Sequence, residues 1–141
     1  MKKISLLVTC LILFLPCVAM AQLATLSISV EGVDPVSGTI EVSLFNSEDL
    51  FMKEPFLQSV SAVESDETIK VEFAGLLEGD YAVVVVHDEN DNGVLDTGFL
   101  GFGGESFSFS NDAKPWLGRP SFEEASITIG VEDTAIVINL D

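Results

Sequence analysis

One short segment of the chain carries residue types that could bind a hard metal ion. From position 88 the sequence reads Asp-Glu-Asn-Asp-Asn-Gly-Val-Leu-Asp, so oxygen-bearing side chains recur at alternate positions up to Gly93. Ca²⁺ takes about six to eight oxygen ligands, and alternate side chains of a tightly curled loop can converge on one ion. The pattern therefore predicts a calcium site with ligands from Asp88, Asn90, Asn92 and Asp96 and from the backbone carbonyl group of Val94.

This loop departs from the EF-hand pattern in two ways. The EF-hand loop ends in a bidentate Glu, at a position where this chain has Phe99, and its flanks are helices, whereas the flanks here have strand or loop patterns. A β-scaffold would need a further carboxylate, and Glu89, Asp91 and Glu105 are the open candidates. The alternative interpretation is a turn without metal, because Asn, Asp and Gly accept left-handed backbone conformations and cap their own turns.

Few residues could catalyse a reaction. The only histidine, His87, continues the buried face of an expected strand that begins at Tyr81, so we expect a structural role for it. Both cysteines, Cys10 and Cys17, lie in an expected signal peptide, and no serine lies in a Gly-x-Ser-x-Gly motif. The 23 acidic residues offer many pairs, but nothing singles out one pair for glycoside cleavage. We therefore expect no enzymatic activity.

A second segment, residues 99–122, is rich in glycine and aromatic residues. Trp116, which lies between Pro115 and Leu117, could stack on a sugar or on a partner protein. This feature supports an alternative function, a carbohydrate- or peptide-binding module that uses the aromatic loop without metal. The simpler interpretation is a satellite cluster of aromatic side chains under a long loop. The aromatic residues are Phe99, Phe102, Phe107, Phe109, Trp116 and Phe122.

The first 21 residues have the pattern of a secretory signal peptide. Met1-Lys2-Lys3 precedes an apolar run over residues 4–18, and Ala19-Met20-Ala21 follows as a small-residue cleavage site. The run is shorter than the roughly 20 apolar residues of a transmembrane helix. We therefore expect cleavage after Ala21 and a single domain over residues 22–141. The mature protein would be periplasmic or secreted, without membrane insertion after signal cleavage.

The charge of the chain limits its partners. Loss of Lys2 and Lys3 with the signal would leave four basic residues against 23 acidic ones, a formal charge of −19. Such a surface repels the phosphate backbone of nucleic acids and anionic lipids, and it attracts cations. We therefore expect no nucleic-acid partner, whereas Ca²⁺ and a glycan or protein partner remain open.

Alternation of apolar and polar residues at period two recurs through the rest of the chain, while a helical period is almost absent. Such alternation is typical of strands with one buried face and one solvated face. The segment 81–86, Tyr-Ala-Val-Val-Val-Val, is apolar on both faces, which predicts a central strand that is covered on both sides. The expected strands lie near residues 26–30, 40–44, 69–73, 81–86, 107–109, 127–131 and 136–140.

These strands and their turn-rich loops predict an all-β fold, an immunoglobulin-like β-sandwich of about seven antiparallel strands. The turn that leads into Tyr81 fits a tyrosine corner, in which the Tyr hydroxyl group ties its strand to the preceding loop. The last two expected strands would form a hairpin that turns near Glu132-Asp133. In the long connection over residues 45–67, the apolar side chains of Phe51, Phe56 and Leu57 are expected to pack down as a lid.

The chain resembles the bacterial family called domain of unknown function 2141, because several short motifs occur in an order that is similar to the order in that family. The resemblance covers essentially the whole expected mature chain, although residues 101–108 depart from the family pattern, which has a Pro and a Glu-Gly pair there. The resemblance implies a small exported β-sandwich without an established activity. At the level of the fold, the chain also resembles transthyretin-like sandwiches. The motifs are Tyr81-Ala82-Val83, His87-Asp88-Glu89-Asn90, Asn92-Gly93, Leu95-Asp96, Phe109-Ser110-Asn111 and Pro120-Ser121-Phe122-Glu123-Glu124-Ala125.

Together these features favour an exported, non-enzymatic β-sandwich module that is stabilised by calcium. Its expected role is binding or structural, in the cell envelope or outside the cell.

Overall fold

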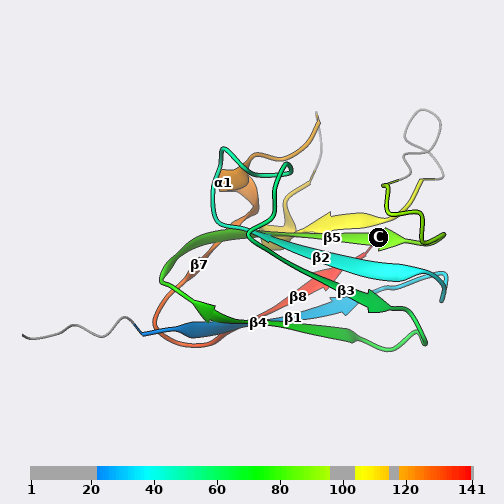
Figure 1. The fold of residues 1–141 in the computed structure, drawn as a ribbon, viewed down its shortest axis with the longest axis horizontal. Helices are drawn as coiled ribbons and strands as arrows, with labels where there is room; N and C mark the ends of the chain where they lie inside the picture. The colour runs from blue at the N-terminus through cyan, green and yellow to red at the C-terminus, as the bar shows by residue number, and fades with distance from the viewer. Residues whose placement is uncertain (1–21, 96–103, 115–117, 141) are drawn as a thin grey trace, which may run out of the picture.

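The computed structural model describes residues 22–95, 104–114 and 118–140, and the expected signal peptide lies outside them. The described chain forms two stacked β-sheets, which confirms the all-β sandwich (Figure 1). It contains eight strands, one 3₁₀ turn and one short helix. These are β1 (Ala24–Glu31), β2 (Thr39–Phe45), β3 (Leu57–Ala62), β4 (Ile69–Leu76), β5 (Gly79–Asp88), β6 (Phe107–Phe109), η2 (Ser110–Asp112), α1 (Phe122–Ala125), β7 (Ser126–Ile129) and β8 (Thr134–Asn139).

The two sheets differ in size and in strand direction. The three-stranded sheet has the order β4-β1-β8, in which β1 is antiparallel to β4 and parallel to β8. The five-stranded sheet has the order β3-β2-β5-β6, and β7 pairs with the first half of β5 on the same side as β6. All pairs in this second sheet are antiparallel. The sandwich is therefore mixed rather than wholly antiparallel.

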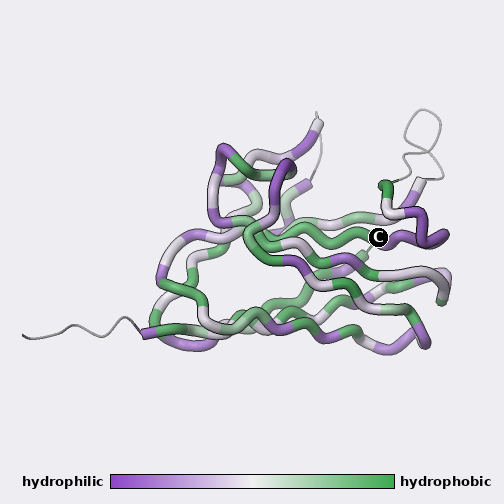
Figure 2. The backbone as a smooth tube through the Cα atoms, in the orientation of Figure 1, coloured by the Kyte–Doolittle hydropathy of each residue, from purple (hydrophilic) through white to green (hydrophobic). Residues whose placement is uncertain are grey.

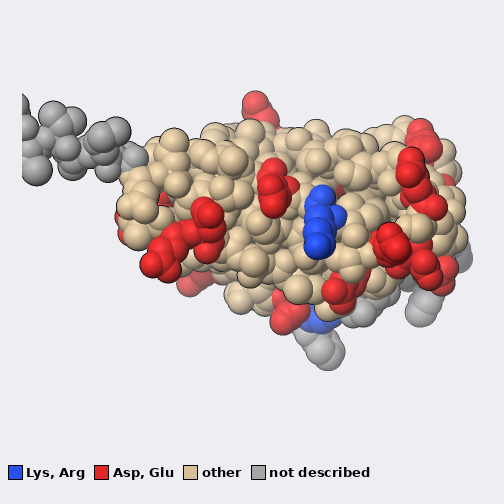
Figure 3. Space-filling view, turned by 90° about the horizontal axis from the view of Figure 1, so that it is seen from below, with Lys and Arg blue, Asp and Glu red and all other residues tan. Residues whose placement is uncertain are grey.

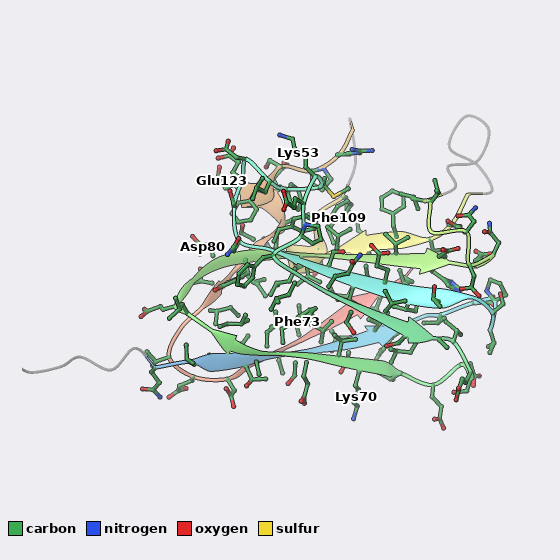
Figure 4. All side chains as sticks on the ribbon, in the orientation of Figure 1. Lys53, Lys70, Phe73, Asp80, Phe109 and Glu123 are labelled. Atoms are coloured by element: carbon green, nitrogen blue, oxygen red, sulfur yellow. The ribbon has the colours of Figure 1, made fainter. Side chains whose placement is uncertain are left out.

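The main core lies between the sheets and follows from the alternation of the strands. In β1, Leu26, Ile28 and Val30 are fully buried, while the residues between them are partly exposed. Phe73 of β4 points between the sheets and Lys70 of the same strand points away from them (Figure 4). Hydrophobic residues accordingly follow the strands, and hydrophilic residues collect in the turns (Figure 2).

The central strand β5 is covered on both faces, as its sequence predicts. Tyr81, Val83 and Val85 enter the main core, and Ala82 and Val84 enter a second cluster on the outer face of the five-stranded sheet. The connection between β2 and β3, together with α1, lies over this outer face (Figure 1). We call the second group the outer cluster; its buried members are Phe45, Phe51, Ala82, Val84, Phe109 and Ala125.

The connection over residues 45–67 was only partly predicted. Phe51 packs into the outer cluster as expected, but Phe56 and Leu57 are exposed, and Leu57 begins the additional strand β3. The sequence Leu-Gln-Ser-Val-Ser-Ala of this strand has no buried residue and no clean alternation of apolar and polar residues. Because β3 lies at a sheet edge and pairs with β2 through its backbone, burial left no signal in its sequence.

The expected hairpin at residues 127–140 is wrong. β7 pairs with β5 in one sheet, whereas β8 runs parallel to β1 in the other sheet. The chain therefore crosses between the sheets near Glu132-Asp133 instead of turning back on itself. Both strands carry the same alternating pattern, and this pattern states only that one face is buried, not which sheet supplies the cover.

The tyrosine corner is present. The hydroxyl group of Tyr81 donates a hydrogen bond to the carbonyl oxygen of Leu77 at 3.0 Å, and the Tyr81 ring is buried in the main core. The interaction fixes the entry of β5, the strand whose other end leads into the predicted calcium loop. Among the described residues, no helix has the length and apolar character needed to cross a bilayer.

Candidate functional site

The predicted calcium loop begins at the last residue of β5 and starts the connection to β6. Asp88 opposes Thr39 of β2 in the sheet, and its side chain is buried. After it, the backbone turns sharply, with positive φ angles at Asp91 (57°) and Gly93 (73°). Asp and Gly accept this left-handed conformation more readily than most residues, so the local sequence explains the turn.

The carboxylate of Asp88 organises this turn. One oxygen accepts a hydrogen bond from the backbone N–H group of Gly93 at 2.7 Å, and the other accepts from that of Asn92 at 3.2 Å. The N–H group of Gly93, helped by those of Asn92, Asp91 and Asn90, holds the pKa of the Asp88 carboxyl below its ordinary value, although burial acts in the opposite direction. The carboxylate is therefore kept ionised by the loop that it closes.

The other predicted ligands have different surroundings. Asn90, Asn92 and Val94 are less buried than Asp88, and the side-chain oxygen of Asn92 accepts a hydrogen bond from the backbone N–H group of Val94 at 2.8 Å. Asp96 lies outside the described residues. The structure thus brings Asp88 and Asn92 together through the curled backbone, and it does not describe the far end of the loop.

Glu105 is the one of the three candidate carboxylates that is buried beside the loop. It comes from the segment that enters β6, and its side chain is only 8% exposed. One carboxylate oxygen accepts a hydrogen bond from the backbone N–H group of Glu89 at 3.1 Å. By contrast, Asp91 is exposed and Glu89 is half-buried. Two buried carboxylates, from Asp88 and Glu105, therefore hold the first turn of the loop from two different segments.

The chemistry of these donors fits a hard cation in part. The ionised Asp88 carboxylate is an acceptor of the kind that a hard cation prefers, and the loop N–H groups directed at it share its lone pairs with any ion. Within residues 22–95, 104–114 and 118–140, no three His, Cys, Asp or Glu side chains converge as a metal cluster. The described residues thus supply an organised turn, and a complete ligand set for calcium would need backbone or amide oxygens or Asp96 as well.

The base of the loop is braced by the connection between β1 and β2. His87 is fully buried, and its Nε2 lies 2.8 Å from the carbonyl oxygen of Ser37, which can only accept, so Nε2 carries the proton. Nδ1 has no hydrogen-bond partner among the described atoms. The backbone of Gly38 touches that of Asp88 so closely that a Cβ atom at position 38 would overlap the Asp88 carbonyl oxygen. No sequence pattern indicates this contact, because Gly38 and Asp88 are far apart in the chain.

A family model described as "Uncharacterized protein conserved in bacteria (DUF2141)" matches residues 28–137. The chain belongs to this family. The matched range includes the described part of the candidate loop and Glu105. Comparisons with curated proteins and with solved structures each returned no match.

One of the motifs that resemble the DUF2141 family has a structural role in the outer cluster. The hydroxyl group of Ser110 accepts a hydrogen bond from the backbone N–H group of Val83 at 2.8 Å and donates one to the carbonyl oxygen of Ala125 at 2.5 Å. The side-chain amide of Asn111 donates to the carbonyl oxygen of Glu124 at 2.9 Å. These bonds join β5 to α1, so the motif holds the outer cluster together.

The aromatic segment of this DUF2141 domain packs inward where the structure describes it. Phe109 is buried in the outer cluster, and Phe107 and Phe122 are partly buried against it. This arrangement confirms the satellite cluster for these three residues. Trp116, Phe99 and Phe102, on which a sugar- or peptide-stacking surface would depend, lie outside the described residues.

The lowered pKa of Asp88 predicts a specific loss of stability in acid. A carboxyl whose pKa is lower in the folded state stabilises the fold above its unfolded pKa, about 3.9, and this contribution disappears as pH falls through the folded pKa. We expect Asp88→Asn to lower the urea midpoint near neutral pH and to have a much smaller effect near about pH 2.

Asp91→Asn is the matched control for this experiment, since it removes one negative charge from an exposed position of the same loop. Subtracting the pH dependence of its urea midpoint from that of Asp88→Asn removes the general effect of the loop charge. A difference between the native protein and Asp88→Asn that stays constant from neutral to acid pH would contradict the role assigned to the Asp88 carboxylate.

Proposed function

We propose that this protein is an exported, non-enzymatic β-sandwich module whose loop from Asp88 to Asp96 binds calcium, and that the ion stabilises a binding or structural unit in the periplasm or outside the cell. The observation that carries the proposal is the Asp88 carboxylate, buried at the end of the central strand and surrounded by the N–H groups of its own loop. The buried Glu105 carboxylate supports the same turn from the segment before β6.

Electrostatics favours a cation at this position. Removing two carboxylates from water is costly unless positive charge or hydrogen-bond donors compensate for the lost hydration. Backbone N–H groups compensate in part, and a divalent ion would compensate further. The chain has 23 acidic residues and six basic ones, so its general field also raises the local concentration of cations.

In this proposal the ion would be held by oxygen atoms of Asp88, Asn90, Asn92, Val94 and Asp96, and Glu105 would act as the additional carboxylate. With two amide ligands, the dissociation constant is expected to be about 0.1 to 1 mM, the range of extracellular modules. The ion would supply charge neutralisation and a fixed centre for the loop. The residues themselves would position the connection between β5 and β6.

The test is the melting temperature of the mature protein with and without calcium. At a calcium concentration of about 100 times the dissociation constant, the added stability is about 2.7 kcal/mol, which corresponds to a rise of roughly 10 °C for a domain of this size. Magnesium at the same concentration is the control for ionic strength, since it prefers a tighter octahedral shell with several waters.

Asp88→Asn should reduce the calcium-dependent rise to about 2 °C or less, and the exposed Asp91→Asn should retain most of it. Comparing the rise within each variant, instead of the melting temperature itself, separates loss of the ion from loss of the Asp88 hydrogen bonds. An equal rise in the native protein and Asp88→Asn, or an equal response to magnesium, would show that the loop is a turn and not a calcium site.

A further inference from the structure

The edge strand β3 differs from the edge strands β4, β6 and β8 of the sandwich. It pairs with β2 on one side, and among the described strands nothing pairs with its other side. The edge strand β4 of the opposite sheet carries exposed charges at Lys70 and Glu72. At the remaining side of the sandwich, the hydroxyl group of Ser108 in β6 donates to the carbonyl oxygen of Asn139 in β8 at 2.6 Å. β3 has neither protection, since Leu57–Ala62 contains no charged residue and no proline.

The backbone of β3 presents free pairing positions to solvent. Val63, the residue after β3, donates its N–H group to the carbonyl oxygen of Gly38 at 3.0 Å. Hydrogen-bonded positions alternate along an antiparallel ladder, so the N–H and C=O groups of Val60 point away from β2, as do those of Gln58 and Ala62. This row of outward groups is the template that an added strand requires.

Apolar side chains accompany this edge. Val60 is 60% exposed, Phe56 is 49% exposed and Leu57 is 36% exposed. Isolated exposed apolar residues are ordinary, but these three lie within one short segment. An added strand would cover apolar surface as well as satisfy the backbone groups.

The charges around β3 select the partner. Three carboxylates and one lysine precede the strand in the connection from β2, and three carboxylates follow it before β4. Figure 3 shows the molecule from the side of the three-stranded sheet, and this face also presents more acidic than basic side chains. A second copy of the chain, with a formal charge of −17, would be repelled, whereas a cationic segment would be attracted. The carboxylates are Glu48, Asp49, Glu54, Glu64, Asp66 and Glu67.

We propose that β3 is a docking edge for an extended, basic segment of another protein, which adds to the five-stranded sheet beside Val60. Backbone hydrogen bonds to Gln58, Val60 and Ala62 provide the pairing, and the apolar side chains contact alternate residues of the added strand. Lysine or arginine side chains of the partner lie near the flanking carboxylates. This surface is independent of the calcium loop and does not need the ion.

The experiment uses the mature protein and a synthetic peptide of about eight residues in which Val and Lys alternate, a length that matches an ordinary strand. Amide NMR spectra are recorded during titration. We expect shifts and slowed hydrogen exchange at Gln58, Val60 and Ala62. A peptide in which Glu replaces Lys should bind at least about tenfold more weakly, and salt should weaken the Val-Lys complex.

Two changes to the backbone test strand addition itself. Val60→Pro removes an N–H group that faces away from β2, so it should weaken binding of the Val-Lys peptide by about tenfold or more. Val60→Thr keeps the N–H group, and its dissociation constant for the peptide should stay within about threefold of the native value. A Val-Lys peptide with methylated backbone nitrogens should not bind to the native protein, and this result does not depend on how well Val60→Pro folds.

Three results would overturn the proposal. The first is equal binding of the Val-Lys and Val-Glu peptides, and the second is a set of shifts that lies away from β3. The third is a change of the β3 signals with protein concentration in the absence of peptide, which would identify a second copy of this chain as the occupant.

Discussion

Gly38→Ala is expected to destabilise the domain by about 3–5 kcal/mol, through steric overlap and an unfavourable backbone conformation together. Gly38 has φ of +73°, and a Cβ atom at this position would overlap the carbonyl oxygen of Asp88 and lie 2.7 Å from Cα of Glu89. Both neighbours are backbone atoms, and Asp88 is fixed in the sheet opposite Thr39. No side chain can rotate away to make room, so the two segments must separate.

Gly75→Ala is the matched control for this prediction. Gly75 has φ of +77°, and a Cβ atom there would meet nothing within 4 Å. Gly75→Ala should therefore lower the free energy of unfolding by about 1–2 kcal/mol, through the unfavourable backbone conformation alone. Urea unfolding of both variants measures the difference. Equal losses of stability for Gly38→Ala and Gly75→Ala would show that the close approach of Gly38 to Asp88 is not present in solution.

The contact at Gly38 also bears on the candidate site. His87 reaches the carbonyl oxygen of Ser37, and Gly38 touches Asp88, so the first ligand of the proposed calcium loop is held by the connection between β1 and β2. The loop is thus anchored by residues that do not belong to it. Its calcium response should depend on this anchor as well as on the oxygen donors themselves.

The parts of the fold that were predictable from sequence are those in which burial leaves a pattern. The uninterrupted apolar run of β5 predicted cover on two faces, and the structure provides it through the main core and the outer cluster. Tyr81 after its tight turn predicted the tyrosine corner. In both cases the pattern that predicts the feature is made by residues that are neighbours in the sequence.

Strand pairing was less accessible, because alternation does not identify a partner. β7 and β8 have the same pattern as a hairpin, yet they pair with β5 and β1 in different sheets. β3 left no apolar pattern because it is an exposed edge. These features depend on contacts between distant segments, and a single sequence does not record such contacts.

The candidate site likewise has one part that the sequence predicts and another part that only the folded chain shows. Alternation at Asp88, Asn90 and Asn92 marked the loop, since neighbouring residues are enough to build a turn. From sequence alone, Glu89, Asp91 and Glu105 were equal candidates for a further carboxylate, and only the folded chain shows Glu105 buried against the N–H group of Glu89. A ligand supplied by a distant segment has no spacing signature.

Phe51→Ala is expected to lower the free energy of unfolding by about 3–5 kcal/mol, the usual range for removing a buried aromatic side chain. The Phe51 ring is only 9% exposed and lies at the centre of the outer cluster. Its centroid is 5.3 Å from that of Phe45, 5.8 Å from Phe122 and 6.5 Å from Phe109. Removing it leaves a cavity between the connection after β2, α1 and the outer face of β5.

The control for this substitution is Phe56→Ala, which removes the same side chain from a half-exposed position of the same connection. Phe56→Ala should lower the free energy of unfolding by about 1 kcal/mol. The half-exposed Phe56 side chain buries less apolar surface on folding than Phe51 does, and its removal leaves no closed cavity. Chemical unfolding measures both values. Hydrogen exchange adds a second measurement, because loss of the Phe51 ring should free the β2–β3 connection while amides of β1 stay protected. Equal effects of the two substitutions would contradict a folded outer cluster over β5, and with it the two-sided burial of the strand that leads to Asp88.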